Sequence, residues 1–592
     1  MTVPRLLRLL LLAVLLGPAL RAQPVGAPLL PLSELKPGLR GTVWTVFKGT
    51  QAEPFSVEVT GVLQNALGPG KSLILCELTD PRVQNMGAVA GMSGSPLYID
   101  GKLAGVLAYQ IQRFETVRYA GFTPIADMLE VSALPLTKPA PASPLPIPVK
   151  SERDTGSVAT ARAGDAPFQA LRPVFTFGGI APRVAEIMAP LFDALGVSAL
   201  ALGGNSGSDA PASASPVDLR PGGVVAAALA VGDITLAAGG TVSHVDGSRV
   251  LAFGHPLMAL GATEVPMAEA EVVTILPSSL NSVKVTNTGR VIGTFSQDRL
   301  SGIYGEIGRM PNLVPVEISL PSRLNRQSLR FSVIQHEMLL PAIVATGLSQ
   351  AVLGSNEAGL TRGFRVRAVV DYANREPLEF VQLYPGPQGL AQGVTEVTAS
   401  LQQWLFNPYE RTFPTRIRFA VEETEDTPVG YIEGFQLSRS APAAGEIIRA
   451  TVDWRGFQTA NATEVVEIPV PADWTGRNLE VVLASGRQLD DLTGRPRSIA
   501  VGQLRDFDEY LHHLRQTRAT DGIYLAVVER STVFTDQTAA TVELPDSFAR
   551  IARNANASRY QQREVAVPLW ERRLLAGRLF TANLRRPLQV VD

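Results

Sequence analysis

A serine between two glycines is the first feature of this chain that could carry chemistry. Glycine tolerates backbone angles that other residues avoid, so a tight turn at this point can expose a serine hydroxyl. Successive backbone N–H groups of such a turn can converge on one point and stabilise the oxyanion of an acyl-transfer reaction. An ordinary hairpin loop has the same composition, so the rest of the chain must decide between the two. The segment reads Gly91-Met92-Ser93-Gly94-Ser95-Pro96.

A serine nucleophile needs a base beside it, and the chain has five histidines. His255 ends an apolar, strand-like run between Gly254 and Pro256. This context would hold its imidazole at the end of a strand, where it could act as a base. The structural alternative is a hydrogen-bonded histidine beneath a loop. The remaining histidines stand in no recognisable motif: His244, His336, His512 and His513.

The residue types do not support a cysteine, metal or cofactor site, or a nucleic-acid partner. The single cysteine, Cys76, lies in an apolar run and fits a buried core residue. No paired histidine motif for zinc and no glycine-rich phosphate loop occurs, so we expect no metal and no cofactor. The 53 basic and 55 acidic residues nearly balance, which does not favour a nucleic-acid partner.

The N-terminus predicts export. Arg5 and Arg8 precede an apolar block at residues 9–16, and small residues follow. This is the order of regions in a secretory signal peptide, with cleavage after Ala19 or Ala22. The apolar block is too short for a good membrane span, and no later segment is long and uncharged enough to be one. We expect an exported protein, periplasmic or extracellular, with no transmembrane segment after removal of residues 1–22.

The serine segment resembles the nucleophile region of the stage IV sporulation protein B peptidase family, which is chymotrypsin-like. Leu251-Ala252-Phe253-Gly254-His255 is similar to the family's catalytic-histidine segment, and the resemblance covers about residues 35–130 and 220–310. It implies Ser93 as nucleophile, His255 as general base, and the N–H groups of Gly91 and Ser93 as oxyanion donors.

The chain departs from the pattern of this family and its chymotrypsin-like relatives. The serine half precedes the histidine half, whereas in the family the histidine comes first, so the two halves would be reversed in chain order. Triads are recognised by geometry and not by order. Chymotrypsin relatives carry an aspartate where Met92 stands, and no recognisable PDZ domain precedes the peptidase segments.

The third catalytic residue has two candidates. Asp80 matches an aspartate of the sporulation family. Asp298 follows His255 at about the spacing of chymotrypsin-like enzymes, roughly 45 residues. We favour Asp80 and keep Asp298 as the alternative acid; a Ser–His dyad is a further possibility.

The alternating, β-branched pattern of the chain predicts a mainly β fold, and the resemblance implies a chymotrypsin-like double β-barrel assembled from two separated halves. β-rich and β-sandwich domains would follow. The expected divisions are the signal peptide (1–22), the serine half (23–135), a Pro/Ala/Gly-rich linker with a short helix (136–220), the histidine half (221–318), a β-rich domain (319–430), a β-sandwich-like domain (431–500) and a C-terminal α/β region (501–592).

These features predict a secreted serine endopeptidase that cleaves proteins, including itself, through an acyl-enzyme on Ser93. Its flexible-looking segments near residues 138–165 and 203–216 would be sites of self-cleavage. The alternative is a catalytically silent scaffold with a peptidase-like fold. Its C-terminal β domains would then bind a cell-surface or periplasmic partner.

Overall fold

The structure is a computed structural model that describes most of the chain from residue 24 onward. The expected signal peptide and the expected self-cleavage segments lie almost entirely outside the described residues. The described ranges are 24, 26–111, 117–136, 168–202, 204–205, 218–278, 282–321, 326–353, 364–385, 399–402, 404–405, 409–410, 412–424, 427–494, 506–536, 540–542 and 560–591.

Six antiparallel strands near the N-terminus close into a barrel, in the order β4-β1-β2-β3-β6-β5, because β4 also pairs with β5. Alternating side chains such as Val57 and Val59 point into its core, as the period of two requires. A one-turn helix, α2 (Pro81–Met86), and α3 (Ile125–Ser132) flank the strands. The strands are β1 (Arg40–Val46), β2 (Ala52–Leu63), β3 (Leu73–Leu78), β4 (Pro96–Ile99), β5 (Lys102–Ile111) and β6 (Tyr119–Pro124).

A second ring of six strands follows, in the pairing order β11-β14-β15-β16-β13-β12, and β12 returns to β11. A tight turn at Gly247 joins β12 to β13, since Asp246 pairs with Arg249 across this hairpin. The strands of this ring are β11 (Val224–Gly232), β12 (Thr235–Asp246), β13 (Arg249–Ala252), β14 (Gly261–Leu276), β15 (Val283–Arg299) and β16 (Gly302–Ile307).

The second ring belongs to a large mixed sheet that extends beyond it on both sides. On one side β12 pairs with β8 (Phe175–Gly178), which pairs with β9 (Ala199–Leu200), and β10 (Gly204–Asn205) pairs with β15. On the other, β11 pairs with β18 (Arg326–Ile334), followed by β17 (Leu313–Pro321), β21 (Arg416–Glu423), β19 (Phe364–Asp371) and β20 (Leu378–Tyr384). The residues expected as a separate β-rich domain therefore continue the same sheet.

Two helices pack together on this large sheet. The expected short helix of the linker is α4 (Pro182–Ala194), with Pro190 inside it. It contacts α5 (Leu339–Leu353). Nearly all of α5 is buried, which explains why its sequence shows no polar face.

The C-terminal part is a sandwich of two sheets around one core, which includes Phe435, Val481 and Leu525. Because β25 pairs with β26, the sheet crosses the boundary expected at residue 500. The first sheet holds β24 (Asn461–Pro469), β23 (Ile447–Gly456), β22 (Val429–Leu437) and β29 (Leu579–Phe580); the second holds β27 (Ala540–Val542), β26 (Ile523–Asp536), β25 (Leu479–Ser485), β30 (Asn583–Leu588) and β28 (Tyr560–Leu574). Helices α7 (Gly486–Leu492) and α8 (Phe507–Arg515) lie at its inner end.

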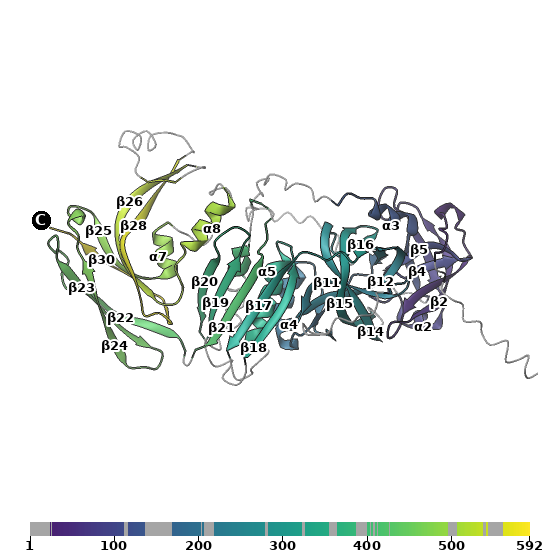
Figure 1. Cartoon of the computed structure of the whole chain (residues 1–592), viewed down its shortest axis with the longest axis horizontal. Helices are drawn as coiled ribbons and strands as arrows, with labels where there is room; N and C mark the ends of the chain where they lie inside the picture. Colours follow the sequence, from purple (N-terminus) through teal and green to yellow (C-terminus); the bar gives the residue numbers. More distant parts are fainter. Residues whose placement is uncertain are drawn as a thin grey trace, which may run out of the picture.

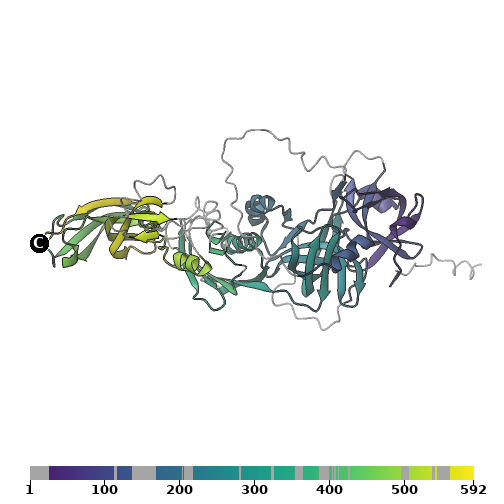
Figure 2. The same ribbon diagram turned by 90° about the horizontal axis from the view of Figure 1, so that it is seen from above.

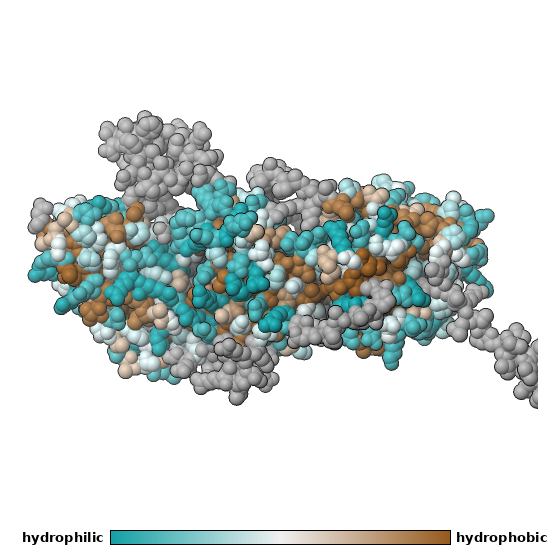
Figure 3. All heavy atoms as spheres, in the orientation of Figure 1, coloured by the Kyte–Doolittle hydropathy of each residue, from teal (hydrophilic) through white to brown (hydrophobic). Residues whose placement is uncertain are grey.

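The molecule is elongated, with the first barrel and the second ring at one end and the sandwich at the other (Figures 1 and 2). The face in Figure 3 carries hydrophobic residues over the first barrel and the second ring, while hydrophilic residues cover much of the middle of the molecule. None of the helices in the described ranges is both long and apolar enough to span a membrane.

Candidate active site

Ser93 lies on a tight turn between β3 and β4, which are the third and fourth strands of the first barrel. The turn needs its glycines, because Gly91 and Gly94 have φ angles of +97° and +93°, a region that residues with a Cβ rarely adopt. Its backbone is fixed by hydrogen bonds from Met92 N to Val89 O and from Gly94 N to Leu107 O (2.9 and 2.7 Å).

The turn leaves two backbone N–H groups unused. Gly91 and Ser93 are buried, yet neither N–H has an acceptor among the residues that the structure describes. Buried N–H groups are nearly always paired, so two free ones in one turn point to an acceptor that comes from outside it. This is the arrangement that an oxyanion hole requires.

The two serines of the turn differ in their partners. The Ser95 hydroxyl donates to the Met92 carbonyl at 2.6 Å and is therefore engaged within the turn. The Ser93 side chain is 1 % exposed, and its hydroxyl has no hydrogen-bond partner in the described ranges. The geometry favours Ser93 over Ser95 as the nucleophile.

Strand β12 of the second ring holds the serine turn in place. Thr241 N donates to Ser93 O at 2.9 Å, and Thr241 Oγ1 donates to Gly91 O at 3.1 Å. A Cβ at Gly94 would lie 2.1 Å from Thr241 O and 2.6 Å from Phe253 N. Only glycine permits this approach, so Gly94 is a contact point between the two rings as well as a turn residue.

His255 lies between β13 and β14, the third and fourth strands of the second ring, and therefore corresponds in position to Ser93 in the first. The first barrel holds the histidine segment in return. Thr123 Oγ1 of β6 donates to Gly254 O at 2.7 Å. A Cβ at Gly254 would lie 2.5 Å from Val106 and 3.3 Å from Ala108, both on β5.

Strand β5 thus brings the serine and histidine segments together. Leu107 accepts a hydrogen bond from Gly94, the residue after Ser93, while the neighbouring Ala108 packs against Gly254, the residue before His255. The segments that carry the two expected catalytic residues come from different rings, and the residue next to each, Gly94 or Gly254, lies against the same short part of β5.

The His255 imidazole is fully buried. Burial lowers its pKa to about 4, against the opposing effect of the backbones of Pro256 and Leu171, so the ring is neutral at physiological pH. Its Nδ1 lies 2.8 Å from the Pro256 carbonyl, which favours the tautomer with a proton on Nδ1. Among the described residues Nε2 has no hydrogen-bond partner, so its lone pair is available, as a general base requires.

Asp298, at the end of β15, supports the turn that follows His255. Its carboxylate accepts hydrogen bonds from the N–H groups of Leu257, Met258 and Leu260 (2.7, 2.8 and 2.9 Å). Burial raises the pKa of Asp298, although these N–H groups lower it in part. In the described part of the chain its carboxylate makes no hydrogen bond to the imidazole.

Asp80 has a different environment from the one that we expected. It caps α2 by accepting a hydrogen bond from Arg82 N at 2.9 Å, and it also pairs with the Arg82 guanidinium at 3.1 Å. Its partial burial raises the carboxyl pKa, but the bonds to Arg82 outweigh that effect and lower it overall. None of its contacts among the described residues reaches His255. Asp80 as a catalytic acid stays a prediction, and the geometry favours Asp298 beside the histidine.

Lys284, on β15, is a residue that the sequence did not single out. It is 4 % exposed, and its Nζ donates to Thr45 Oγ1 of β1 at 2.9 Å. A Cβ at Gly91 would lie 3.0–3.3 Å from its aliphatic stem. Burial lowers its pKa to about 7, and no carboxylate pairs with it within the described ranges. A single lysine in an alternating strand gives no signal of this in the sequence.

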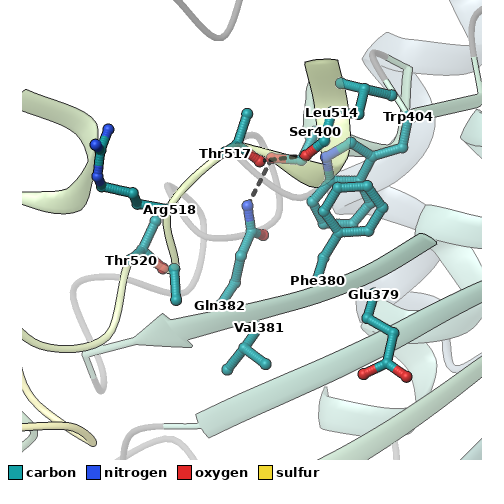
Figure 4. A pocket seen from close by; sticks show the side chains of 11 residues that line it. Glu379, Phe380, Val381, Gln382, Ser400, Trp404, Leu514, Thr517, Arg518 and Thr520 are labelled. Atoms are coloured by element: carbon teal, nitrogen blue, oxygen red, sulfur yellow. Dashed lines mark hydrogen bonds between the residues drawn. The ribbon is translucent and has the colours of Figure 1, made fainter. Parts of the chain in front are cut away.

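A separate cavity of about 140 Å³ lies where the large sheet meets the sandwich. Figure 4 shows Phe380 and Trp404 stacked on one side of it, at 3.8 Å between ring centroids, and Gln382 hydrogen-bonded to Ser400. The described residues that line it include neither histidine nor cysteine. The serine turn lies in the barrels at the end of the molecule away from the sandwich (Figure 1).

A serine on a glycine turn, two N–H groups without an acceptor among the described residues, and a neutral histidine from the second ring make up the kind of site found in serine peptidases. Comparison with known families agrees: residues 28–126, which include the first barrel and Ser93, match the family SpoIVB peptidase S55. The match ends before His255. No curated protein matches the chain. No solved structure matches it either.

Proposed function

We propose that the chain is a serine endopeptidase that uses Ser93 as nucleophile and His255 as general base. The family match at residues 28–126 suggests a serine peptidase. The observation that carries the residue assignment is the pair of unused N–H groups at Gly91 and Ser93, set in a turn that is built against the histidine segment.

In this mechanism His255 Nε2 takes the hydroxyl proton as Ser93 Oγ attacks the scissile carbonyl. The N–H groups of Gly91 and Ser93 donate to the oxyanion. His255 then gives the proton to the leaving amine, and water hydrolyses the acyl-enzyme with His255 again acting as base. Asp298 acts as a positioning residue, because its bonds fix the turn that follows His255.

The two rings of strands support a double barrel of the chymotrypsin type with its halves in reversed chain order. Ser93 and His255 lie at corresponding positions in their rings, each between the third and fourth strand. The reversed chain order is compatible with such a site, since triads are recognised by geometry and not by order.

We further propose that the protein is exported, on the strength of the basic and apolar pattern at residues 1–22. Its substrates would then be exported or cell-surface proteins. The sandwich is large and contains none of the candidate catalytic residues, so it is suited to binding a substrate or a partner.

The test is prolonged digestion of an unfolded, alkylated protein substrate by the purified full chain, with products read by mass spectrometry. We expect Ser93→Ala to remove the products, because loss of the nucleophile typically costs more than about 10³-fold in rate. Ser95→Ala is the matched control and should retain cleavage. Unchanged cleavage by Ser93→Ala would refute the assignment. No cleavage by any folded variant would favour the silent scaffold.

A further inference from the structure

A short strand from the connection between the two rings lies on the part of β5 that meets both candidate catalytic segments. This strand, β7 (Phe168–Ala170), runs antiparallel to the end of β5, with Ala170 opposite Tyr109 and Gln169 opposite Gln110. The pairing continues by one hydrogen bond, from Leu171 N to Ala108 O at 2.8 Å. Strand β4 pairs with β5 only as far as Val106, so β7 adds a strand to the end of β5 that extends beyond the closed part of the first barrel.

Leu171, the residue after β7, reaches the candidate site itself. Its side chain is 1 % exposed and belongs to the same buried apolar cluster as Val89 and Met92 of the serine turn. Its backbone raises the pKa of His255. Its N–H donates to the carbonyl of Ala108 on β5, and the Ala108 side chain lies next to Gly254, the residue before His255.

The chain then leaves directly for the second ring. Residues 172–174 follow Leu171, and β8 begins at Phe175, which pairs with Ala238 of β12. The connection therefore passes from an edge of the first barrel to an edge of the second, and its buried leucine lies where the serine and histidine segments meet.

We propose that the end of β5 is the edge on which the candidate peptidase binds peptides, and that residues 168–171 occupy it in the intact chain. The ligand class is an extended peptide that adds an antiparallel strand, with a leucine-sized aliphatic side chain at the position of Leu171. Main-chain bonds along such an edge give affinity, and a pocket for one side chain gives specificity.

This inference rests on the proposed function. It adds a substrate preference for a leucine-sized side chain, and it adds that residues 168–171 block the peptide-binding edge in the intact chain. The bound segment is tethered at both ends, so its local concentration is of the order of millimolar. An outside peptide must displace it before reaching Ser93. The intact chain should react slowly, and the chain with the segment released should react fast.

The first test is the rate at which a fluorophosphonate labels the full chain. Leu171→Glu places a charge in the apolar cluster and should release the segment, which we expect to speed labelling at least about tenfold. Leu200→Glu, at an exposed leucine of β9, is the matched control and should label like wild type. Gln169→Pro breaks the strand pairing without changing the core and should also speed labelling if Leu171→Glu misfolds.

The second test is binding and needs no catalysis. Fluorescein-labelled Phe-Gln-Ala-Leu is titrated into the full chain carrying Ser93→Ala with Leu171→Glu or with Gln169→Pro, and fluorescence anisotropy is measured. We expect saturable binding to a folded released chain, at least tenfold weaker binding to the chain with Ser93→Ala alone, and no binding of a peptide that ends in glutamate.

The two tests separate the possible failures. Peptide binding without labelling of any variant would refute the proposed function and leave the peptide-binding edge standing. Labelling that depends on Ser93 but is equally fast in the wild type and the released variants, with no peptide binding, would overturn this inference and leave the proposed function intact.

Discussion

Replacement of Lys284 by methionine should stabilise the barrels near neutral pH, and the gain should disappear at high pH. The lysine is fully buried between β15 and β1, with the Thr45 hydroxyl as the partner of its Nζ. Its pKa is about 7 in the folded chain, because burial disfavours the charged ammonium. In the unfolded chain its pKa is that of an ordinary lysine, about 10.4.

The sign follows from proton binding. Between pH 7 and pH 10.5 the unfolded chain binds more protons at this lysine than the folded chain does, so the stability of the wild type rises with pH. The folded pKa of about 7 and the unfolded pKa of about 10.4 differ by about 3.4. Because the folded chain is half protonated at pH 7 and the unfolded chain is about half protonated at pH 10.5, the stability changes by about 4 kcal/mol between these two pH values. Loss of the hydrogen bond to Thr45 costs Lys284→Met about 1 kcal/mol at every pH, so it does not change the difference between the two pH values.

The assay is urea unfolding at pH 7 and at pH 10.5. Hydrogen exchange mass spectrometry of peptides from β1 and β15 monitors the unfolding. We expect Lys284→Met to exceed the wild type in free energy of unfolding by about 4 kcal/mol more at pH 7 than at pH 10.5. Lys36→Met, at an exposed lysine, should show no such difference. An equal effect of Lys284→Met at both pH values would refute the reasoning.

Three further substitutions test the contacts that hold the site and the sandwich. Gly94→Ala should destabilise the first barrel and the second ring by at least about 2 kcal/mol in thermal unfolding, because its Cβ would lie 2.1 Å from a backbone oxygen. Gly101→Ala is the control: Gly101 also has a positive φ, but a Cβ there would meet open space, so the substitution should cost only about 1 kcal/mol. Asp298→Asn should weaken its turn by about 1–3 kcal/mol, seen as faster hydrogen exchange at residues 257–260 and slower fluorophosphonate labelling. Asp490→Asn leaves the buried Arg518 (side chain 5 % exposed) with Glu571 as its carboxylate partner and should cost the sandwich about 3 kcal/mol in urea unfolding, with labelling unchanged.

The parts of the site that depend on local sequence could be predicted. The glycines around Ser93 indicated a turn with unusual backbone angles, and Gly91 and Gly94 adopt them. The run that ends at Gly254 indicated a histidine held at a strand end, and His255 lies three residues beyond the end of β13, in the connection to β14. The mainly β character also followed from alternation, which reports directly on strands.

The parts that depend on pairing between distant segments could not be predicted. Asp298 bonds to a turn about 40 residues earlier, and Lys284 is buried by a strand from the other ring. The alternation of apolar and polar residues does not say which strand lies opposite another. The sequence therefore did not predict that β25 pairs with β26 across residue 500, or that β7 pairs with β5. The resemblance to the family pointed to Asp80, whose partner in the structure is Arg82.

The most direct test of the central claim is to map the site of a fluorophosphonate adduct on the full chain after prolonged labelling. Tandem mass spectrometry should place the adduct on Ser93 in the wild type. His255→Ala should lower its yield by at least about 10³-fold while the melting profile shows a folded chain. An adduct on another residue, or equal labelling of Ser93 without His255, would contradict the proposal that these two residues form one catalytic site.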